Sequence, residues 1–189
     1  MKRDIVSFDS SFTLCLILVS FIVTLIQETF VPGFAHIFAT HNKWDIGIVL
    51  HIFGHSSWSH FLGNVVYIAM LGPSVEETFG SIPLMIMTLL SAVFIGIVSV
   101  IFKNPCYGLS SIAYMWVILN TFQINNSKKI PLTSIILLVI FVLPEVIAMF
   151  IKSDNIGHQN HVLGAIFGLV FGIAAKAIYS TKNESSEQL

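Results

Sequence analysis

The sequence predicts an all-α membrane protein with six transmembrane helices. Apolar residues make up 55% of the 189 residues, charged residues only 10%, and the mean hydropathy is +0.86. Soluble domains carry about a quarter charged residues. Apolar runs of up to about 20 residues, the length that crosses a bilayer as a helix, recur along the chain. We therefore expect one membrane domain over 11–179, between a cytoplasmic N-terminus, 1–10, and a cytoplasmic polar tail, 180–189.

The first predicted span, 11–31, has no cleavage-type site after it, so we interpret it as an uncleaved membrane helix. The next stretch, 33–55, contains glycines and polar residues and is too polar to span, so we expect it to lie in or on the membrane interface. Five further spans follow in order, bounded by prolines, glycines and polar residues: 58–73, 83–102, 109–124, 131–151 and 161–179.

The second and fourth predicted spans, 58–73 and 109–124, are short for a bilayer. A helix end that stops inside hydrocarbon would leave backbone polar groups without partners. Protein or water must therefore surround these ends, which predicts a water-accessible cavity.

The basic residues predict that both termini are cytoplasmic, because cytoplasmic loops carry an excess of Lys and Arg. With six spans, this orientation places six basic residues inside and three outside. Those inside are Lys2, Arg3, Lys128, Lys129, Lys176 and Lys182, and those outside are Lys43, Lys103 and Lys152. We expect a multi-pass protein of the inner or plasma membrane.

Composition also excludes some classes of function. The formal net charge is -1 and no basic block is present, so nothing indicates nucleic-acid binding. No internal repeat supports a transporter built from inverted halves. Cys15 and Cys106 have neither the number nor the spacing of a disulfide framework or a zinc site.

Three polar clusters stand at the outward ends of spans two, four and six. His60 and Asn64 are at i and i+4, so both side chains project from one helical face. Ser110 opens a helix, where free backbone N–H groups can stabilise an oxyanion. His161 shares a face with Gly164 and Gly168, whose spacing permits close approach of a neighbouring helix.

A serine hydroxyl becomes a good nucleophile when a base lies within hydrogen-bond reach. We therefore expect Ser110 to act as nucleophile and His161 as its base. The sequence places no carboxylate beside His161 except Asp154 in the preceding loop, so it predicts a dyad rather than a triad. Glu145 is the one acid well inside an apolar run, and we assign it no role.

These motifs resemble those of rhomboid intramembrane serine proteases in their order and spacing, over nearly the whole chain. The matching runs are His60-Phe-Leu-Gly-Asn64, Leu71-Gly72-Pro-Ser-Val-Glu76-Glu-Thr-Phe-Gly80-Ser81, Gly108-Leu-Ser110 and His161-Val-Leu-Gly164. The resemblance implies a six-helix rhomboid-like bundle in the lipid bilayer. It also implies an enzyme that cleaves transmembrane or juxtamembrane segments of other membrane proteins without a cofactor, and it leaves the oligomeric state open.

The resemblance also implies a role for each matching residue. Ser110 would be the nucleophile and His161 the general base, with His60, Asn64 and the Ser110 backbone N–H holding the oxyanion. Tyr114 would pack on His161 and orient it. The remaining roles are close packing at Gly108, Gly164 and Gly168, a structural role for Glu76 in the cytoplasmic loop after span two, and a first external loop formed by 33–55.

Two positions depart from the family pattern. Ser111 replaces the second glycine of Gly-x-Ser-Gly, and Asp45 replaces the arginine that often follows a tryptophan in the first loop. An inactive rhomboid-like protein that binds membrane clients is therefore one alternative. A small transporter or channel lined by histidines is the other.

Two pairs of histidines have the spacing of metal ligands on a helix: His51 with His55, and His158 with His161. No His-Glu-x-x-His run is present, and no cysteine or carboxylate is suitably placed to complete a set of ligands. We therefore expect no metal site.

Overall fold

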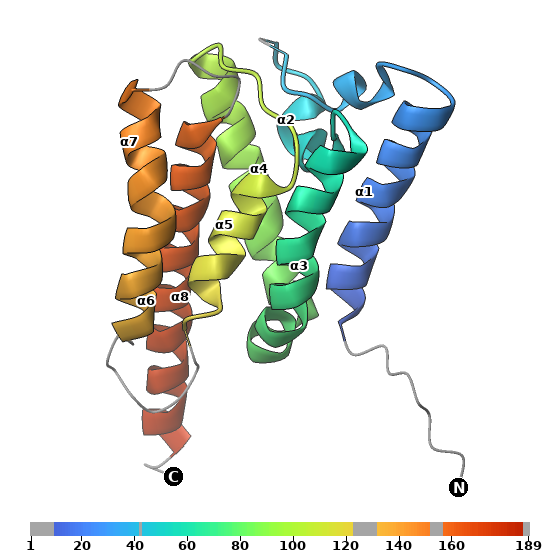
Figure 1. Cartoon of the computed structure of the whole chain (residues 1–189). Coiled ribbons are helices and arrows are strands. Elements are labelled where there is room, and N and C mark those ends of the chain that lie inside the picture. The colour runs from blue at the N-terminus through green and yellow to red at the C-terminus, as the bar shows by residue number, and fades with distance from the viewer. Residues whose placement is uncertain (1–9, 42, 123–131, 152–156, 187–189) are drawn as a thin grey trace, which may run out of the picture.

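The computed structural model describes residues 10–41, 43–122, 132–151 and 157–186, and all regular secondary structure within these ranges is helical. This confirms the predicted all-α class. Figure 1 shows the long helices running side by side as a bundle, with the first turn of the first helix and the last turn of the last helix at the same end.

The bundle has six helical segments among the described residues. These are α1 (Ser11–Thr29), α3 (Trp58–Phe79), α4 (Ser81–Ile101), α5 (Ser110–Leu119), the segment formed by α6 (Leu132–Leu137), η3 (Leu138–Val142) and α7 (Leu143–Ile151), and α8 (His158–Ser186). Three short elements lie between α1 and α3: η1 (Phe34–Ile37), α2 (Gly47–Leu50) and η2 (His51–Phe53).

Three of the described helices are long and apolar enough to cross a membrane: Ser11–Thr29, Ser81–Ile101 and His158–Tyr179, with hydropathies of 2.0, 2.7 and 2.0. Large apolar side chains remain exposed on all three, among them Leu18, Leu90 and Ile178. An apolar exposed surface of this kind is suited to lipid rather than water, and it is what an integral membrane protein presents.

Helix α5 has only ten residues, which confirms that the fourth predicted span is short. All of its residues from Ser111 to Leu119 except Tyr114 are buried, and Met115 and Trp116 are completely so. The helix packs mainly against α8 and α3. Because protein surrounds it, its ends need not meet hydrocarbon.

The second predicted span, by contrast, is not short. It continues as α3 through Pro73 to Phe79, and Gly80 then ends the helix with a φ of 87°. The last predicted span also begins earlier than expected, at His158, and continues to Ser186, so most of the predicted tail 180–189 is helical.

Glu76 lies within α3 and not in a loop after it, so its predicted location was wrong. Its carboxylate accepts hydrogen bonds from the backbone N–H groups of Phe12 and Thr13, both at 2.8 Å, and from the hydroxyls of Thr13 and Ser81, both at 2.6 Å. Free N–H groups at a helix start favour such an anion. The carboxylate thereby joins the start of α1 to the α3–α4 turn.

The stretch predicted as the first external loop folds over one end of the bundle. His51 Nε2 donates a hydrogen bond to the Ala92 carbonyl of α4 at 3.0 Å. Gly96 on α4 has no room for a side chain, because a Cβ there would overlap the backbone of Ile48. Asp45 accepts a hydrogen bond from the Gly47 N–H at 2.9 Å. The acidic residue at position 45 thus has a local role at the start of α2.

Candidate active site

Ser110 is the first residue of α5, and the segment before it descends from one end of the bundle into its interior (Figure 1). The Gly108 N–H donates to the His51 carbonyl at 2.8 Å, and the Leu109 N–H donates to His55 Nε2 at 3.4 Å. Gly108 has a φ of 107°, a conformation that L-residues with a side chain rarely adopt. The first loop and this glycine together position the start of α5.

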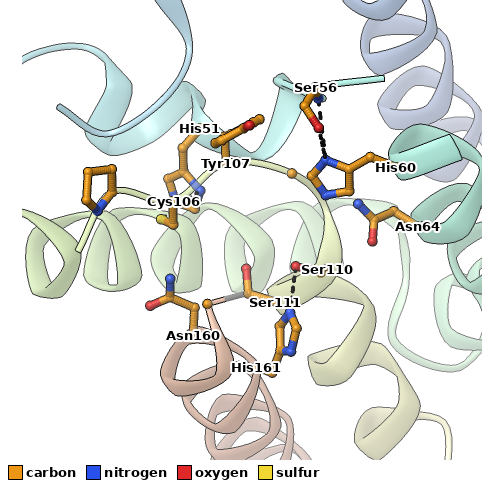
Figure 2. A pocket seen from close by; sticks show the side chains of 13 residues that line it. His51, Ser56, His60, Asn64, Cys106, Tyr107, Ser110, Ser111, Asn160 and His161 are labelled. Carbon is orange, nitrogen blue, oxygen red and sulfur yellow. Dashed lines mark hydrogen bonds between the residues drawn. The ribbon is translucent and has the colours of Figure 1, made fainter. Parts of the chain in front are cut away.

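The structure brings Ser110 and His161 together, with 2.9 Å between Ser110 Oγ and His161 Nε2 (Figure 2). The two residues come from α5 and α8, which meet through glycines. A Cβ at Gly164 would overlap the Ser111 carbonyl, and one at Gly168 would lie too close to the Met115 carbonyl. Backbone contact between the two helices is therefore what places the hydroxyl within reach of the imidazole.

Tyr114 lies one turn after Ser110 and stacks on His161, with the two ring centroids 4.6 Å apart and the ring planes 6° from parallel. Its hydroxyl donates a hydrogen bond to Glu145 Oε1 at 2.7 Å. Tyr114 therefore touches both the imidazole and a carboxylate.

That carboxylate belongs to the residue to which the sequence assigned no role. Glu145 Oε2 lies 2.9 Å from His161 Nδ1 and 2.6 Å from His158 Nδ1. The expectation that only Asp154 could stand near His161 was thus wrong, and Asp154 itself lies outside the described residues. The sequence feature that could have indicated this contact is the position of Glu145 inside an apolar run, because an acidic residue there usually has a partner within the bundle.

His60 and Asn64 project from α3 toward the turn before Ser110. The Ser57 hydroxyl accepts a hydrogen bond from the His60 N–H and begins the helix, and the Ser56 N–H donates to His60 Nδ1 at 3.4 Å. An Nδ1 that accepts a hydrogen bond leaves the proton of a neutral imidazole on Nε2. His60 Nε2 is then a donor.

These two donors lie beside Gly108. A Cβ at this glycine would lie 2.9 Å from His60 Nε2 and 3.2 Å from Asn64 Nδ2. The amide nitrogen of Asn64 is buried and has no hydrogen-bond partner among the described residues. The missing side chain of Gly108 leaves space toward which both donors are directed.

A cavity of about 550 Å³ connects these groups and is lined by residues of the first loop, α3, the segment between α4 and α5, α5 itself and α8 (Figure 2). Asn160 lines it next to His161, and neither its amide oxygen nor its amide nitrogen has a hydrogen-bond partner in the part of the chain that is described. No motif in the sequence singles out Asn160. A bound polypeptide could hydrogen-bond both atoms, since an amide side chain donates and accepts.

Ser111, the departure from the family pattern, is buried in the wall of this cavity. Figure 2 shows its side chain next to Ser110 and apart from the line that joins Ser110 to His161. The hydrogen bond between Ser110 and His161 is thus formed with serine at position 111.

The first pair of candidate metal ligands, His51 and His55, is engaged in other bonds. Burial, and then the nearby His60, lower the pKa of His55 to about 3, so this ring is neutral and can accept from the Leu109 N–H. Burial lowers the pKa of His51, but its contact with the Cys106 thiol, 3.7 Å from Nδ1, leaves that pKa raised. Burial raises the pKa of Cys106, yet the same contact leaves it lowered.

The second pair, His158 and His161, forms a cluster with Glu145 in which one ligand atom from each residue lies within 4.8 Å of the others, so the expectation that no carboxylate stands near this pair was wrong. Its two nitrogen–oxygen distances, 2.6 and 2.9 Å, are hydrogen-bond lengths. Ligands around a tetrahedral zinc ion, with bonds of about 2.0–2.1 Å, stand roughly 3.3 Å apart. The cluster therefore has the geometry of hydrogen bonds to a shared carboxylate.

Comparison with known proteins gives a consistent match. A family model described as Rhomboid domain matches residues 41–177. The chain is 33% identical over 125 residues to the Rhomboid protease GlpG of Salmonella paratyphi A (strain ATCC 9150 / SARB42), and to the proteins of that name from Salmonella newport (strain SL254) and Salmonella heidelberg (strain SL476). Each match covers 63% of this chain and 44% of the relative, so the chain matches less than half the length of these relatives.

Proposed function

The chain belongs to the rhomboid family, and on that premise we propose that it is an intramembrane serine protease with Ser110 as nucleophile and His161 as general base. The observation that carries the proposal is the 2.9 Å contact between Ser110 Oγ and His161 Nε2 on the wall of a cavity within a bundle of apolar helices. A hydroxyl and a base at this distance can transfer a proton as the nucleophile attacks.

In the proposed reaction, His161 Nε2 takes the proton of Ser110 while Oγ attacks a peptide carbonyl carbon. His60 Nε2–H, the Asn64 amide and the Ser110 backbone N–H stabilise the resulting oxyanion. His161 then gives its proton to the departing amine, which leaves an acyl-enzyme on Ser110. A water molecule, deprotonated by His161, releases the acyl group and restores the serine.

The proposed substrate is a transmembrane or juxtamembrane segment of another membrane protein. A regular helix uses its carbonyls in internal hydrogen bonds, so the segment must unwind locally before attack. The unpaired amide of Asn160 offers the unwound backbone both a donor and an acceptor. No cofactor has a place in this scheme.

We further propose a multi-pass topology of six spans in the inner or plasma membrane, with both termini cytoplasmic. Helix α1 begins and α8 ends at the same end of the bundle, and the six helical segments between those points support an even number of crossings (Figure 1). Tags fused to either terminus would report this orientation, because a protease added to sealed vesicles digests only the tags on their outer face.

Labelling with a fluorophosphonate tests the proposed chemistry directly. The full chain in proteoliposomes should bind the reagent at one residue, identified as Ser110 by peptide mass spectrometry, and should cleave a reporter with a single transmembrane segment. A folded protein that neither labels nor cleaves would overturn the proposal in favour of an inactive, client-binding member of the family. Labelling at a different serine would contradict the assigned nucleophile.

Replacing Asn64 with alanine is expected to lower kcat by about 10²–10³-fold, the usual effect of removing one oxyanion donor. KM should change little, because the donor acts on charge that develops only in the transition state. Reporter cleavage kinetics measure both constants. The exposed Ser74→Ala on the same helix is the matched control and should retain wild-type kinetics. A change in KM alone for Asn64→Ala would contradict the oxyanion role.

A further inference from the structure

We propose that Glu145 is a positioning residue for His161 and completes a Ser110–His161–Glu145 triad, an inference that rests on the proposed serine protease activity. The carboxylate would hold the imidazole in the tautomer that can accept the serine proton, and it would stabilise the charged imidazole that forms next. The sequence alone predicted a dyad.

The hydrogen bonds of His161 define the tautomer. Ser110 Oγ–H must donate to a lone pair on Nε2 for proton transfer, so a neutral His161 must carry its proton on Nδ1. Glu145 Oε2 lies 2.9 Å from Nδ1. An ionised carboxylate only accepts hydrogen bonds, and it therefore favours the Nδ1–H tautomer over the unproductive Nε2–H form.

The Glu145 side chain is itself held in place by residues of two other helices. The Tyr114 hydroxyl of α5 donates to Oε1 at 2.7 Å, and His158 Nδ1 of α8 lies 2.6 Å from Oε2. The side chains of Glu145 and His161 are 14% and 11% exposed. Because little solvent reaches the pair, the carboxylate acts at close range on the positive charge that His161 gains in the transition state.

The backbone before Glu145 explains how a carboxylate reaches this site from α7. The π-helical turn η3 ends at Val142, and Pro144 follows in the first turn of α7. Proline lacks the N–H that would bond the carbonyl four residues earlier, and π-helical turns accommodate such breaks while rotating the residues that follow. Glu145, the next residue, then meets α5 and α8.

The test compares Glu145→Gln with Glu145→Asp. Glutamine keeps the size of the side chain but removes its charge and its acceptor-only character, whereas aspartate keeps both. We expect Glu145→Gln to lower kcat by about 10²–10⁴-fold with KM within threefold, as loss of a triad carboxylate does. The kcat of Glu145→Asp should be at least tenfold higher than that of Glu145→Gln. The matched control is Glu77→Gln, an exposed carboxylate on α3, which should retain the wild-type kcat.

A second measurement needs no variant. In ¹⁵N-histidine-labelled protein, the His161 ring should show the Nδ1–H tautomer, with a strongly downfield Nδ1 proton. A ring in the Nε2–H form would overturn the inference even if Glu145→Gln failed to fold. A kcat for folded Glu145→Gln within threefold of wild type would also overturn it.

The outcomes separate this inference from the proposed function. If the wild-type protein labels and cleaves at Ser110 but Glu145→Gln keeps its kcat, the triad is wrong and the protease stands. If the wild type itself neither labels nor cleaves, the proposed function fails, whatever tautomer His161 shows.

Discussion

Replacing Ser110 with alanine is expected to abolish fluorophosphonate labelling and to lower kcat for reporter cleavage by about 10⁶-fold, as loss of a serine protease nucleophile does. His161→Ala should have an effect of similar size, because the hydroxyl and the imidazole, 2.9 Å apart, act as one unit. The double variant should therefore be no slower than either single variant. Single-turnover cleavage in proteoliposomes measures all three.

Two control variants make the result specific. His36→Ala replaces an exposed histidine of the first loop and should retain wild-type rates. Ser111→Ala removes the hydroxyl next to the proposed nucleophile, and the labelling of Ser110 should persist. If Ser110→Ala kept more than about a hundredth of the wild-type activity while Ser111→Ala lost it, the nucleophile would be Ser111 and our assignment would be wrong.

The fold class and the partnership of Ser110 with His161 could be predicted from the sequence because both depend on local patterns. Apolar runs specify membrane helices whatever surrounds them. Gly164 and Gly168 specify a helix face that can approach another helix closely. His161 lies on the same face, so this approach brings its imidazole to the neighbouring helix. Only the order of the motifs was then needed to select α5 as the partner of α8.

Contacts between distant segments could not be predicted in the same way. Glu145 is an isolated acid in an apolar run. The neighbouring Pro144 indicates an irregularity in the helix, but neither residue indicates that Glu145 is directed toward His161. Glu76 follows Pro73, which predicts a helix end. The helix nevertheless continues to Phe79, and its Glu76 carboxylate accepts hydrogen bonds from backbone N–H groups of α1 that are 63 and 64 residues away in sequence. Hydrophobic periodicity reports burial, not the partner of a polar group.

Replacing Gly164 with alanine is expected to lower kcat by about 10²-fold, although the three atoms nearest to the added methyl group all belong to the Ser111 backbone and not to the Ser110 or His161 side chain. The methyl group would overlap the carbonyl oxygen and the carbonyl carbon of Ser111. These backbone atoms cannot rotate away, so α5 and α8 must separate. A misplacement of about 1 Å can cost this much rate. Overpacking should also lower the free energy of unfolding by about 1–3 kcal/mol.

Gly63→Ala is the matched control that separates helix contact from the chemistry of the substitution. Gly63 lies on α3, and a Cβ there meets no atom within 4 Å. Alanine is favoured over glycine within a helix by about 0.5–1 kcal/mol, so this variant should be at least as stable as wild type and equally active. Denaturant unfolding in detergent micelles and reporter kinetics compare the two variants. If both behaved alike, backbone contact at Gly164 would not be what holds Ser110 against His161. If only Gly164→Ala loses rate and stability, the alignment of Ser110 with His161 depends on the absence of a side chain at position 164.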